Sequence, residues 1–359
     1  MKKLLIVTGE LSGFIYAREI VRELSPFFEI FGVFTEEAPG SKRILDSKEL
    51  TAFGLFEVIS KLPNILRGKR KIVSFLESEK PDAVLLIDFP GFNLQIAKEA
   101  RKRGIKVFYF IPPKVWAWGK RRVESLRKYC DRIFVILPFE VEFYRQFKID
   151  VTYVGNPLVD IVKPNRKRRE FLETFEIEDP FYALLPGSRP SEVKYLLPTL
   201  KEFSESFGGN WVIPVANTVG ELFKNFLSDN IKLVPEEERY NVLSYAEAGI
   251  IASGTASLEA AISELPHVVV YRVHPLTYFI AKRAVKLPFV SLPNLIAGKE
   301  VVPELLQEDF NGENLNLFLT FETLLENRDW SREVLRKDVK EKLSGGAIKR
   351  LSEEIKREI

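Results

Sequence analysis

The chain contains very little cysteine, histidine or methionine. Of its 359 residues, one is a cysteine, two are histidines and one is a methionine. The single Cys130 excludes a disulfide framework and any site built from several cysteines. His267 and His274 are too few for a histidine-rich metal site. These counts argue against a metal site built from cysteine or histidine, and we expect no cofactor.

The sequence also lacks long apolar runs and a strong excess of charge. The first apolar run, Leu4–Val7, is too short for a signal peptide or a membrane span, so we expect a cytoplasmic protein. A net charge of +3 does not indicate a nucleic-acid binder. The patterns GxxxxGK[ST], HExxH and CxxC are missing, so the sequence gives no support for a P-loop NTPase, a metalloprotease or a cysteine-based zinc site. The few labile residues, including three glutamines, are typical of a thermophile.

The pattern that is present is that of an α/β protein. Short apolar runs alternate with helical patterns through both halves, which predicts parallel, doubly wound sheets. Expected strands are 4–7, 29–34, 83–87, 107–111, 132–136, 151–154, 182–185, 211–214, 232–234, 249–252 and 268–271. Expected helices include 16–24, 72–79 and 94–103, and residues 9–13 are expected to form a loop.

A charged stretch with two prolines, 157–178, indicates a connection between domains. We expect Rossmann-like domains at 1–163 and 164–344, with a helix at 345–359 folding back onto the first. Ligands in open α/β sheets bind at the carboxyl ends of the strands. The expected fold class is therefore α/β, with two facing Rossmann-like domains and an active-site cleft between them.

One segment, 248–259, combines a strand, a tight turn and a helix start. Its sequence is A-G-I-I-A-S-G-T-A-S-L-E. A helix N-terminus attracts anions, phosphate above all. Ser253 and Thr255, on either side of Gly254, can cap the helix or donate to a phosphate, and Glu259 can bind ribose hydroxyls. The alternative is an ordinary capped turn with a solvated glutamate.

Other polar residues follow expected strands. Asp88 can act as a general base or as the N-cap of the next helix. Arg189, after Gly187 and Ser188, can clamp a diphosphate or form a surface ion pair. Trp116 and Trp118 share one loop, and they can stack on a sugar, pack against acyl chains or belong to the core.

Residues 55–71 combine apolar and basic side chains. Such a segment can contact an anionic membrane, or it can be a core-facing helix with a solvated basic end. The residues concerned are Leu55, Phe56, Ile59, Leu62, Ile65, Leu66, Arg67, Lys69, Arg70 and Lys71.

Several blocks together resemble the lipid-A-disaccharide synthases. They include G-E-L-S-G at 9–13, I-D-F-P-G-F-N at 87–93, V-W-A-W at 115–118, L-L-P-G-S-R at 184–189 and A-S-G-T-A-S-L-E at 252–259. The longest spans 271–308 and contains V-S-L-P-N-L-I-A-G-K-E-V-V-P-E-L-L-Q-E. This family is similar to the GT-B glycosyltransferases, which have two facing Rossmann-like domains.

The resemblance implies an inverting transfer that needs no metal. UDP-2,3-diacylglucosamine would donate its sugar to the 6-hydroxyl of 2,3-diacylglucosamine 1-phosphate, giving a β-1,6-linked disaccharide 1-phosphate and UDP. The enzyme would work at the cytoplasmic face of the inner membrane, and a homo-oligomer stays an open expectation. Asp88 would be the base, Arg189, Ser188 and residues 253–255 would hold the UDP, and Glu259 would hold its ribose.

Further roles are also implied by the resemblance. Asn217 would contact the uracil, and Asn294, Glu304 and Gln307 would line the donor sugar and phosphate. The loops on the acceptor side would contribute Gly9, Glu10, Ser12, Gly13, Asn93, Trp116 and Trp118.

The chain departs from the family pattern at three positions. Phe14 stands where the family usually has aspartate, Gly91 where it often has aspartate, and Asn156 where it often has histidine. These substitutions argue against a catalytic role at positions 14 and 91 and leave Asp88 the stronger candidate in its loop. The rival functions are another UDP-sugar enzyme, namely a peptidoglycan N-acetylglucosaminyltransferase or an epimerase, and a non-catalytic sugar-nucleotide-binding protein.

Overall fold

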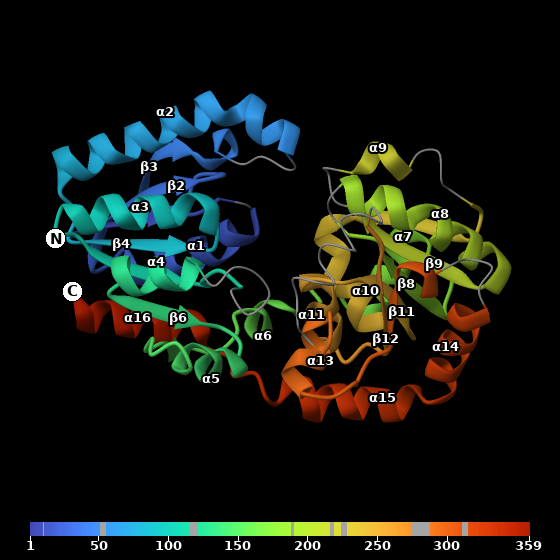
Figure 1. Cartoon of the computed structure of the whole chain (residues 1–359). Coiled ribbons are helices and arrows are strands. Elements are labelled where there is room, and N and C mark those ends of the chain that lie inside the picture. Colours follow the sequence, from blue (N-terminus) through green and yellow to red (C-terminus); the bar gives the residue numbers. More distant parts are fainter. Residues whose placement is uncertain are drawn as a thin grey trace. The chain divides into compact units, whose positions relative to one another are not determined.

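The chain forms two compact units, residues 1–157 with 344–359 and residues 158–343. The computed structural model describes residues 1–9, 11–50, 55–114, 121–187, 190–215, 219–223, 228–273, 288–310 and 315–359, with the backbone alone at 11, 12, 55–61, 121, 191 and 315. Each unit is built on a parallel sheet with helices around it (Figure 1). The predicted α/β class with two Rossmann-like domains is confirmed.

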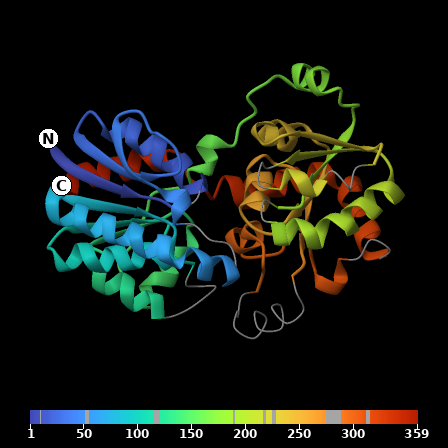
Figure 2. The ribbon, with the colours of Figure 1, turned by 90° about the horizontal axis from the view of Figure 1, so that it is seen from above.

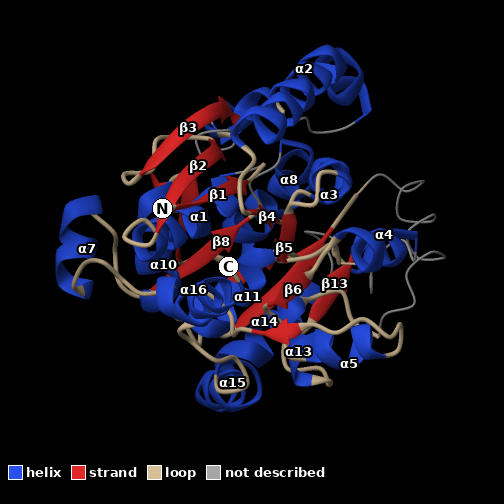
Figure 3. Ribbon diagram, turned by 90° about the vertical axis from the view of Figure 1, so that its left-hand side faces the viewer, coloured by secondary structure: helices blue, strands red, loops and turns tan. Residues whose placement is uncertain are grey.

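The first unit has the strand order β3-β2-β1-β4-β5-β6-β7. Its strands are β1 (Lys2–Val7), β2 (Phe28–Phe34), β3 (Ser41–Asp46), β4 (Ala83–Ile87), β5 (Lys106–Phe110), β6 (Arg132–Val135) and β7 (Thr152–Tyr153). Its helices are α1 (Leu11–Leu24), α2 (Leu55–Glu79), α3 (Pro90–Lys102), α4 (Arg121–Tyr129), α5 (Phe139–Arg145) and α16 (Ala347–Glu358), with a 3₁₀ turn η1 (Ser47–Glu49). Figure 3 shows α2, α3 and α4 on one face of this sheet, and α1 and α16 on the other.

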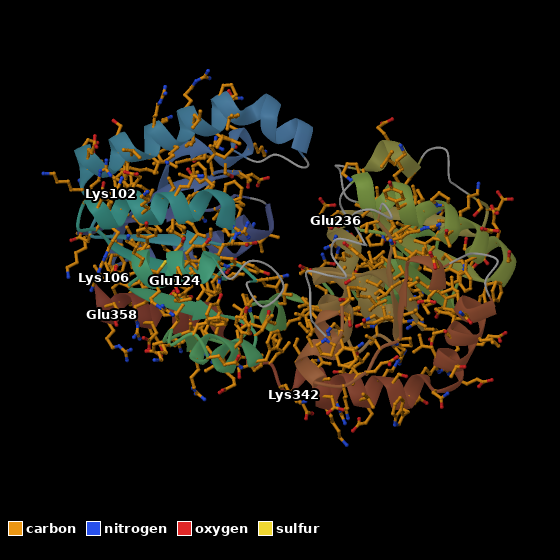
Figure 4. All side chains as sticks on the ribbon, in the orientation of Figure 1. Lys102, Lys106, Glu124, Glu236, Lys342 and Glu358 are labelled. Atoms are coloured by element: carbon orange, nitrogen blue, oxygen red, sulfur yellow. The ribbon has the colours of Figure 1, made fainter. Side chains whose placement is uncertain are left out.

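Helix α16 belongs to the first unit although it follows the second in sequence. It packs against α1, and Figure 2 shows it in red beside the blue N-terminal elements. Arg132 Nη2 lies 3.3 Å from Glu354 Oε2, and Lys106 Nζ lies 3.8 Å from Glu358 Oε2. Figure 4 labels Lys106 and Glu358 next to each other. These ion pairs join α16 to β5 and β6.

The second unit has the strand order β10-β9-β8-β11-β12-β13. Its strands are β8 (Phe181–Leu185), β9 (Asn210–Val215), β10 (Ile231–Pro235), β11 (Gly249–Ala252), β12 (His267–Tyr271) and β13 (Glu304–Leu306). Its helices are α6 (Leu158–Ile161), α7 (Arg168–Phe175), α8 (Pro190–Phe207), α9 (Gly220–Phe223), α10 (Arg239–Tyr245), α11 (Thr255–Ile262), α13 (Leu292–Ala297), α14 (Leu315–Glu326) and α15 (Arg328–Leu335). Shorter turns are η2 (Glu236–Glu238), η3 (Gln307–Asp309) and the π-helical η4 (Arg336–Lys340).

The strand predictions are confirmed to within two residues at either end, but two edge strands were missed. β3 carries charged, exposed residues, and β13 has only 3 residues, so neither shows the continuous apolar run of a buried parallel strand. Every pairing in both sheets is parallel.

Three helices start earlier than expected. α1 begins at Leu11, so the predicted loop 9–13 is wrong for residues 11–13. α2 extends over 25 residues despite Pro63, and α3 begins at Pro90. Glycine, serine and proline are tolerated in a first helical turn, whose amides need no intrahelical partner. No helix in the described part of the chain is both long and apolar enough to span a bilayer.

Candidate active site

The turn between β11 and α11 lies at the carboxyl end of a central, fully buried strand. Its N-cap residue is Gly254, with φ 147°, a backbone conformation that favours glycine. Ser253 Oγ instead donates to the Val290 carbonyl at 3.3 Å. The prediction that Ser253 or Thr255 caps α11 is therefore wrong, because the cap falls on a residue without a side chain. The helix starts with no side-chain cap, a form that suits an anion.

Glu259 lies one turn inside α11 and is only 4% exposed. Its Oε2 accepts from Arg239 Nη1 at 3.2 Å, and its Oε1 accepts from the Tyr240 hydroxyl at 3.4 Å. The alternative of a solvated glutamate is wrong, because α10 packs against α11 and covers this carboxylate.

Arg239 and Tyr240 were not found from the sequence, and neither was Glu236, which pairs with Arg239. Burial alone would lower the pKa of Arg239, but the charges of Glu259 and Glu236 outweigh it and raise that pKa. Burial raises the pKa of Glu236 against the opposing charge of Arg239. Figure 4 labels Glu236 in the second unit. In the sequence, only the run E-E-E-R-Y at 236–240 points to an ion pair of Arg239, and it does not indicate which carboxylate the arginine contacts.

The loop after β8 lies at the neighbouring strand end of the same sheet. Gly187 has φ 103°, a backbone conformation that favours glycine in this turn. Ser188, Arg189 and Asn217 lie outside the described residues.

Asn294, Glu304 and Gln307 use their side chains inside the second unit. Asn294 is completely buried, and its Oδ1 accepts from the amides of Val301 and Val302 at 2.7 Å and 3.0 Å. Glu304 Oε1 accepts from Asn294 Nδ2 at 2.8 Å.

The same glutamate and Gln307 hold main chain at both ends of residues 274–287, which lie outside the described part. Glu304 accepts from the amides of Val290 and Ser291, each at 2.9 Å. Gln307 bonds the amide of Val273 at 2.9 Å and its carbonyl at 3.1 Å. These two side chains therefore hold the main chain on both sides of residues 274–287, within the longest block that resembles the family, 271–308.

In the first unit, Asp88 directly follows the fully buried β4. Its amide donates to the Phe110 carbonyl at 3.0 Å, and its φ is 47°. The N-cap of α3 is Phe89, so the alternative of Asp88 as that cap is wrong. Asn93 is completely buried, and its Nδ2 donates to the Asp88 carbonyl at 2.8 Å.

The remaining acceptor-side residues are only partly described. Gly9 follows β1, and Gly13 lies in the first turn of α1. Glu10, Trp116 and Trp118 lie outside the described residues, as does the side chain of Ser12. β1 and β4 are neighbours in the sheet, so Gly9 and Asp88 follow adjacent strand ends.

Two of the three departures from the family pattern have structural roles. Phe14 is 3% exposed, and its ring lies 5.7 Å from that of Phe34, so it belongs to the core. Asn156 is completely buried, and its Nδ2 donates to the Ile136 carbonyl at 3.3 Å. Gly91 lies in α3 with open space around it.

Helix α2 combines a core-facing side with exposed apolar residues. Ile65, Ile72 and Leu76 contribute to the core of the first unit. Leu62 and Leu66, one turn apart, are 48% and 46% exposed. Arg67, Arg70 and Lys71 are exposed on the same stretch, while Lys69 Nζ donates to Gln95 Oε1 at 3.0 Å. The side chains of residues 55–61, which include Leu55, Phe56 and Ile59, are not described.

No group of three or more histidine, cysteine, aspartate or glutamate side chains is arranged to hold a metal ion in the described parts of the two units. The chemistry that the two units offer is therefore a carboxylate at one strand end and an uncapped helix N-terminus at another.

Comparison with known families gives the decisive observation. The family model for lipid-A-disaccharide synthetase matches residues 4–359. The chain belongs to this family. The lipid-A-disaccharide synthase of Aquifex aeolicus is 39% identical over 342 residues, covering 93% of each chain. That of a Sulfurihydrogenibium species is 38% identical over 382 residues, covering 98% of this chain and 97% of the relative. The suspected resemblance is confirmed, and the chain is a glycosyltransferase with a role in lipid A disaccharide synthesis.

Solved structures share the fold of this lipid-A-disaccharide synthase family member. A UDP-GlcNAc 2-epimerase from Neisseria meningitidis, bound to UDP-GlcNAc, has a TM-score of 0.69 at 16% identity, over 99% of this chain and 100% of the epimerase. MurG from Acinetobacter baumannii has a TM-score of 0.59 at 16% identity, with the same coverage. At these identities the likeness shows the fold alone.

Proposed function

We propose that the protein transfers 2,3-diacylglucosamine from UDP-2,3-diacylglucosamine to the 6-hydroxyl of 2,3-diacylglucosamine 1-phosphate. The products are the β-1,6-linked disaccharide 1-phosphate and UDP. The observation that carries the proposal is the family match over residues 4–359. The polar residues at the carboxyl ends of β4 and β11 support it, because ligands of open α/β sheets bind at such ends.

Asp88 acts as the base that removes the proton of the attacking hydroxyl. An inverting transfer needs one such carboxylate, and a general base contributes about 10²–10⁴-fold to a rate. At the donor side, the leaving UDP gains negative charge. The uncapped amides at the start of α11 stabilise it together with Arg189, because fixed donors aimed at developing charge favour the transition state.

Glu259 binds the ribose of the UDP, and Arg239 and Tyr240 hold its carboxylate in place. Support comes from the two hydrogen bonds that Glu259 receives from them. Asn294 and Glu304 shape the donor region through main chain rather than by direct contact, since their polar atoms bond residues 290–302. Ser188 and Asn217 remain proposed contacts of the phosphate and the uracil.

The test is an assay of the purified protein with the two acylated substrates. UDP release should require both, and UDP-N-acetylglucosamine should be neither transferred nor epimerised. Asp88→Asn should lower kcat by about 10²–10⁴-fold while UDP binding persists, since asparagine tolerates a left-handed backbone. Near wild-type turnover of this variant would remove the base assignment. Epimerisation of UDP-N-acetylglucosamine would instead favour an epimerase.

We further propose that α2 contacts the anionic cytoplasmic face of the inner membrane. The exposed Leu62 and Leu66 offer apolar area, and Arg67, Arg70 and Lys71 offer charge. Replacing these three basic residues with glutamine should weaken binding to phosphatidylglycerol vesicles about tenfold or more.

The matched control for α2 removes three exposed lysines from α3 and α4. These are Lys98, Lys102 and Lys128. Their replacement by glutamine lowers the net charge equally and should change vesicle binding much less. Equal losses in both triple variants would assign the effect to net charge and return α2 to the core-facing alternative.

A further inference from the structure

Asp88 lies in a turn whose backbone conformation is rare for residues other than glycine. Asp88 and Phe89 have φ values of 47° and 50°, so two consecutive residues with a Cβ adopt the left-handed conformation. Aspartate adopts this conformation more readily than most residues, but phenylalanine rarely does, so two such residues in succession persist only where the surroundings hold them. The elements around the turn should therefore contain groups that fix it.

Two buried side chains meet at the carbonyl of Asp88. The Tyr109 hydroxyl donates to this oxygen at 2.8 Å, and Asn93 Nδ2 donates to it at 2.8 Å. A carbonyl oxygen has two lone pairs, so both are used. The Asp88 amide donates to the Phe110 carbonyl, which leaves both main-chain polar groups of Asp88 bonded.

Asn93 works here as a donor. Its Nδ2 also lies 3.2 Å from the Ile87 carbonyl and 3.4 Å from the Val7 carbonyl. Its Oδ1 has no partner among the described residues. The amide is thus turned toward the ends of β1 and β4, which ties the turn to both strands.

Tyr109 is a fully buried residue of β5 whose ring belongs to the core of the first unit. Burial raises the pKa of its hydroxyl well above the ordinary value, and the negative charge of Asp88 adds to that effect. The hydroxyl therefore stays a donor over the whole working pH range. A phenylalanine would fill the same core, so packing does not explain the oxygen.

We propose that Tyr109 and Asn93 are positioning residues that aim the Asp88 carboxylate by holding its left-handed turn through the Asp88 carbonyl. This inference rests on the proposed role of Asp88 as the base. Without the two donors, the turn relaxes toward a less strained backbone. The carboxylate then points away from the attacking hydroxyl, and the rate of the chemical step falls while the substrates still bind.

Tyr109→Phe tests this with the loss of a single oxygen atom. We expect kcat to fall about tenfold, the rate equivalent of one hydrogen bond, with the KM of both substrates and the affinity for UDP changed less than twofold. If the Tyr109 hydroxyl had a purely structural role, its loss would lower the melting temperature without this selective fall in kcat at nearly constant KM. An unchanged kcat, or a raised KM alone, would overturn the inference.

The matched control is Tyr245→Phe in the second unit. The Tyr245 hydroxyl also donates to a main-chain carbonyl, that of Arg166 at 2.5 Å, but it lies outside the proposed site. This variant should show a similar change in melting temperature and a wild-type kcat. An equal loss of kcat in both variants would overturn the inference, because it would assign the effect to general destabilisation.

A second variant, Asn93→Ser, keeps the test independent of how Tyr109→Phe folds. It removes the other donor to the same carbonyl, so kcat should again fall with little change in KM. Wild-type kcat in Asn93→Ser would overturn the inference. Full activity of Asp88→Asn is a separate result that would refute the base itself, so the two failures can be told apart.

Discussion

Replacing Arg239 by methionine should destabilise the second unit by leaving a buried carboxylate without its cation. In the wild type, the side chain of Glu259 is only 5% exposed and its Oε2 lies 3.2 Å from Arg239 Nη1. Methionine retains much of the apolar stem of arginine but removes the guanidinium. Of the two hydrogen bonds described for the Glu259 carboxylate, only the longer one, from the Tyr240 hydroxyl at 3.4 Å, would remain.

The expected size of the effect follows from this burial. Removing one partner of a fully buried ion pair costs about 3–5 kcal/mol. The Arg239 side chain is 23% exposed, so water can reach the vacated position and reduce the penalty. We therefore expect a loss of roughly 2–3 kcal/mol in the free energy of unfolding. For a domain of this size, that corresponds to a fall of about 4–12 °C in Tm.

Urea denaturation of the full chain at pH 7 measures this loss. The double variant Arg239→Met with Glu259→Gln removes both charges, so it should be more stable than Arg239→Met alone. The pair would then show a coupling free energy of about 0.5–3 kcal/mol. Additive effects of the two substitutions would refute the ion pair as a stabilising contact.

Two further predictions concern His267 and Gly9. Burial lowers the pKa of His267 to about 4, and the hydrogen bond with the Leu265 carbonyl offsets part of this effect. The unfolded state therefore binds a proton more readily, so the wild type should lose up to roughly 3 kcal/mol of stability as the pH falls from 6.5 to 4. In urea titrations, His267→Asn should lose less stability over the same pH range. A Cβ at Gly9 would lie 2.3 Å from Phe89 Cγ, so Gly9→Ala should cost about 1–3 kcal/mol by thermal melting. Gly91→Ala, in open space, should cost nothing, and equal melting of the two alanine variants would contradict the close contact.

The sheets could be predicted from local patterns because most strands are buried on both faces. β4 and β11 are fully buried, so each shows a continuous apolar run in the sequence. β3 lies at a sheet edge with Lys42 and Arg43 exposed, so its residues show no such run. Pro63 and Gly68 obscured the true length of α2, because propensity alone disfavours both residues inside a helix.

The residues of the candidate site also fall into those that the sequence could predict and those that it could not. Asp88 and the 253–255 turn could be found from the sequence, since each follows an apolar strand at a point where the residue types change abruptly. Arg239 and Tyr109 could not, because each acts on a residue about twenty positions away along the chain. Nothing in the local sequence of either residue says which partner it meets.

The sequence by itself determined most of the strands, the position of the 253–255 turn and the family, because apolar runs, glycines and short motifs are properties of a few neighbouring residues. Tertiary structure decided how the polar groups are used. It buries Glu259 beside an arginine, bends Asp88 into a left-handed turn under two donors, and turns Asn294 inward. Such pairings depend on which elements pack together, and packing is a property of the whole unit rather than of any one segment.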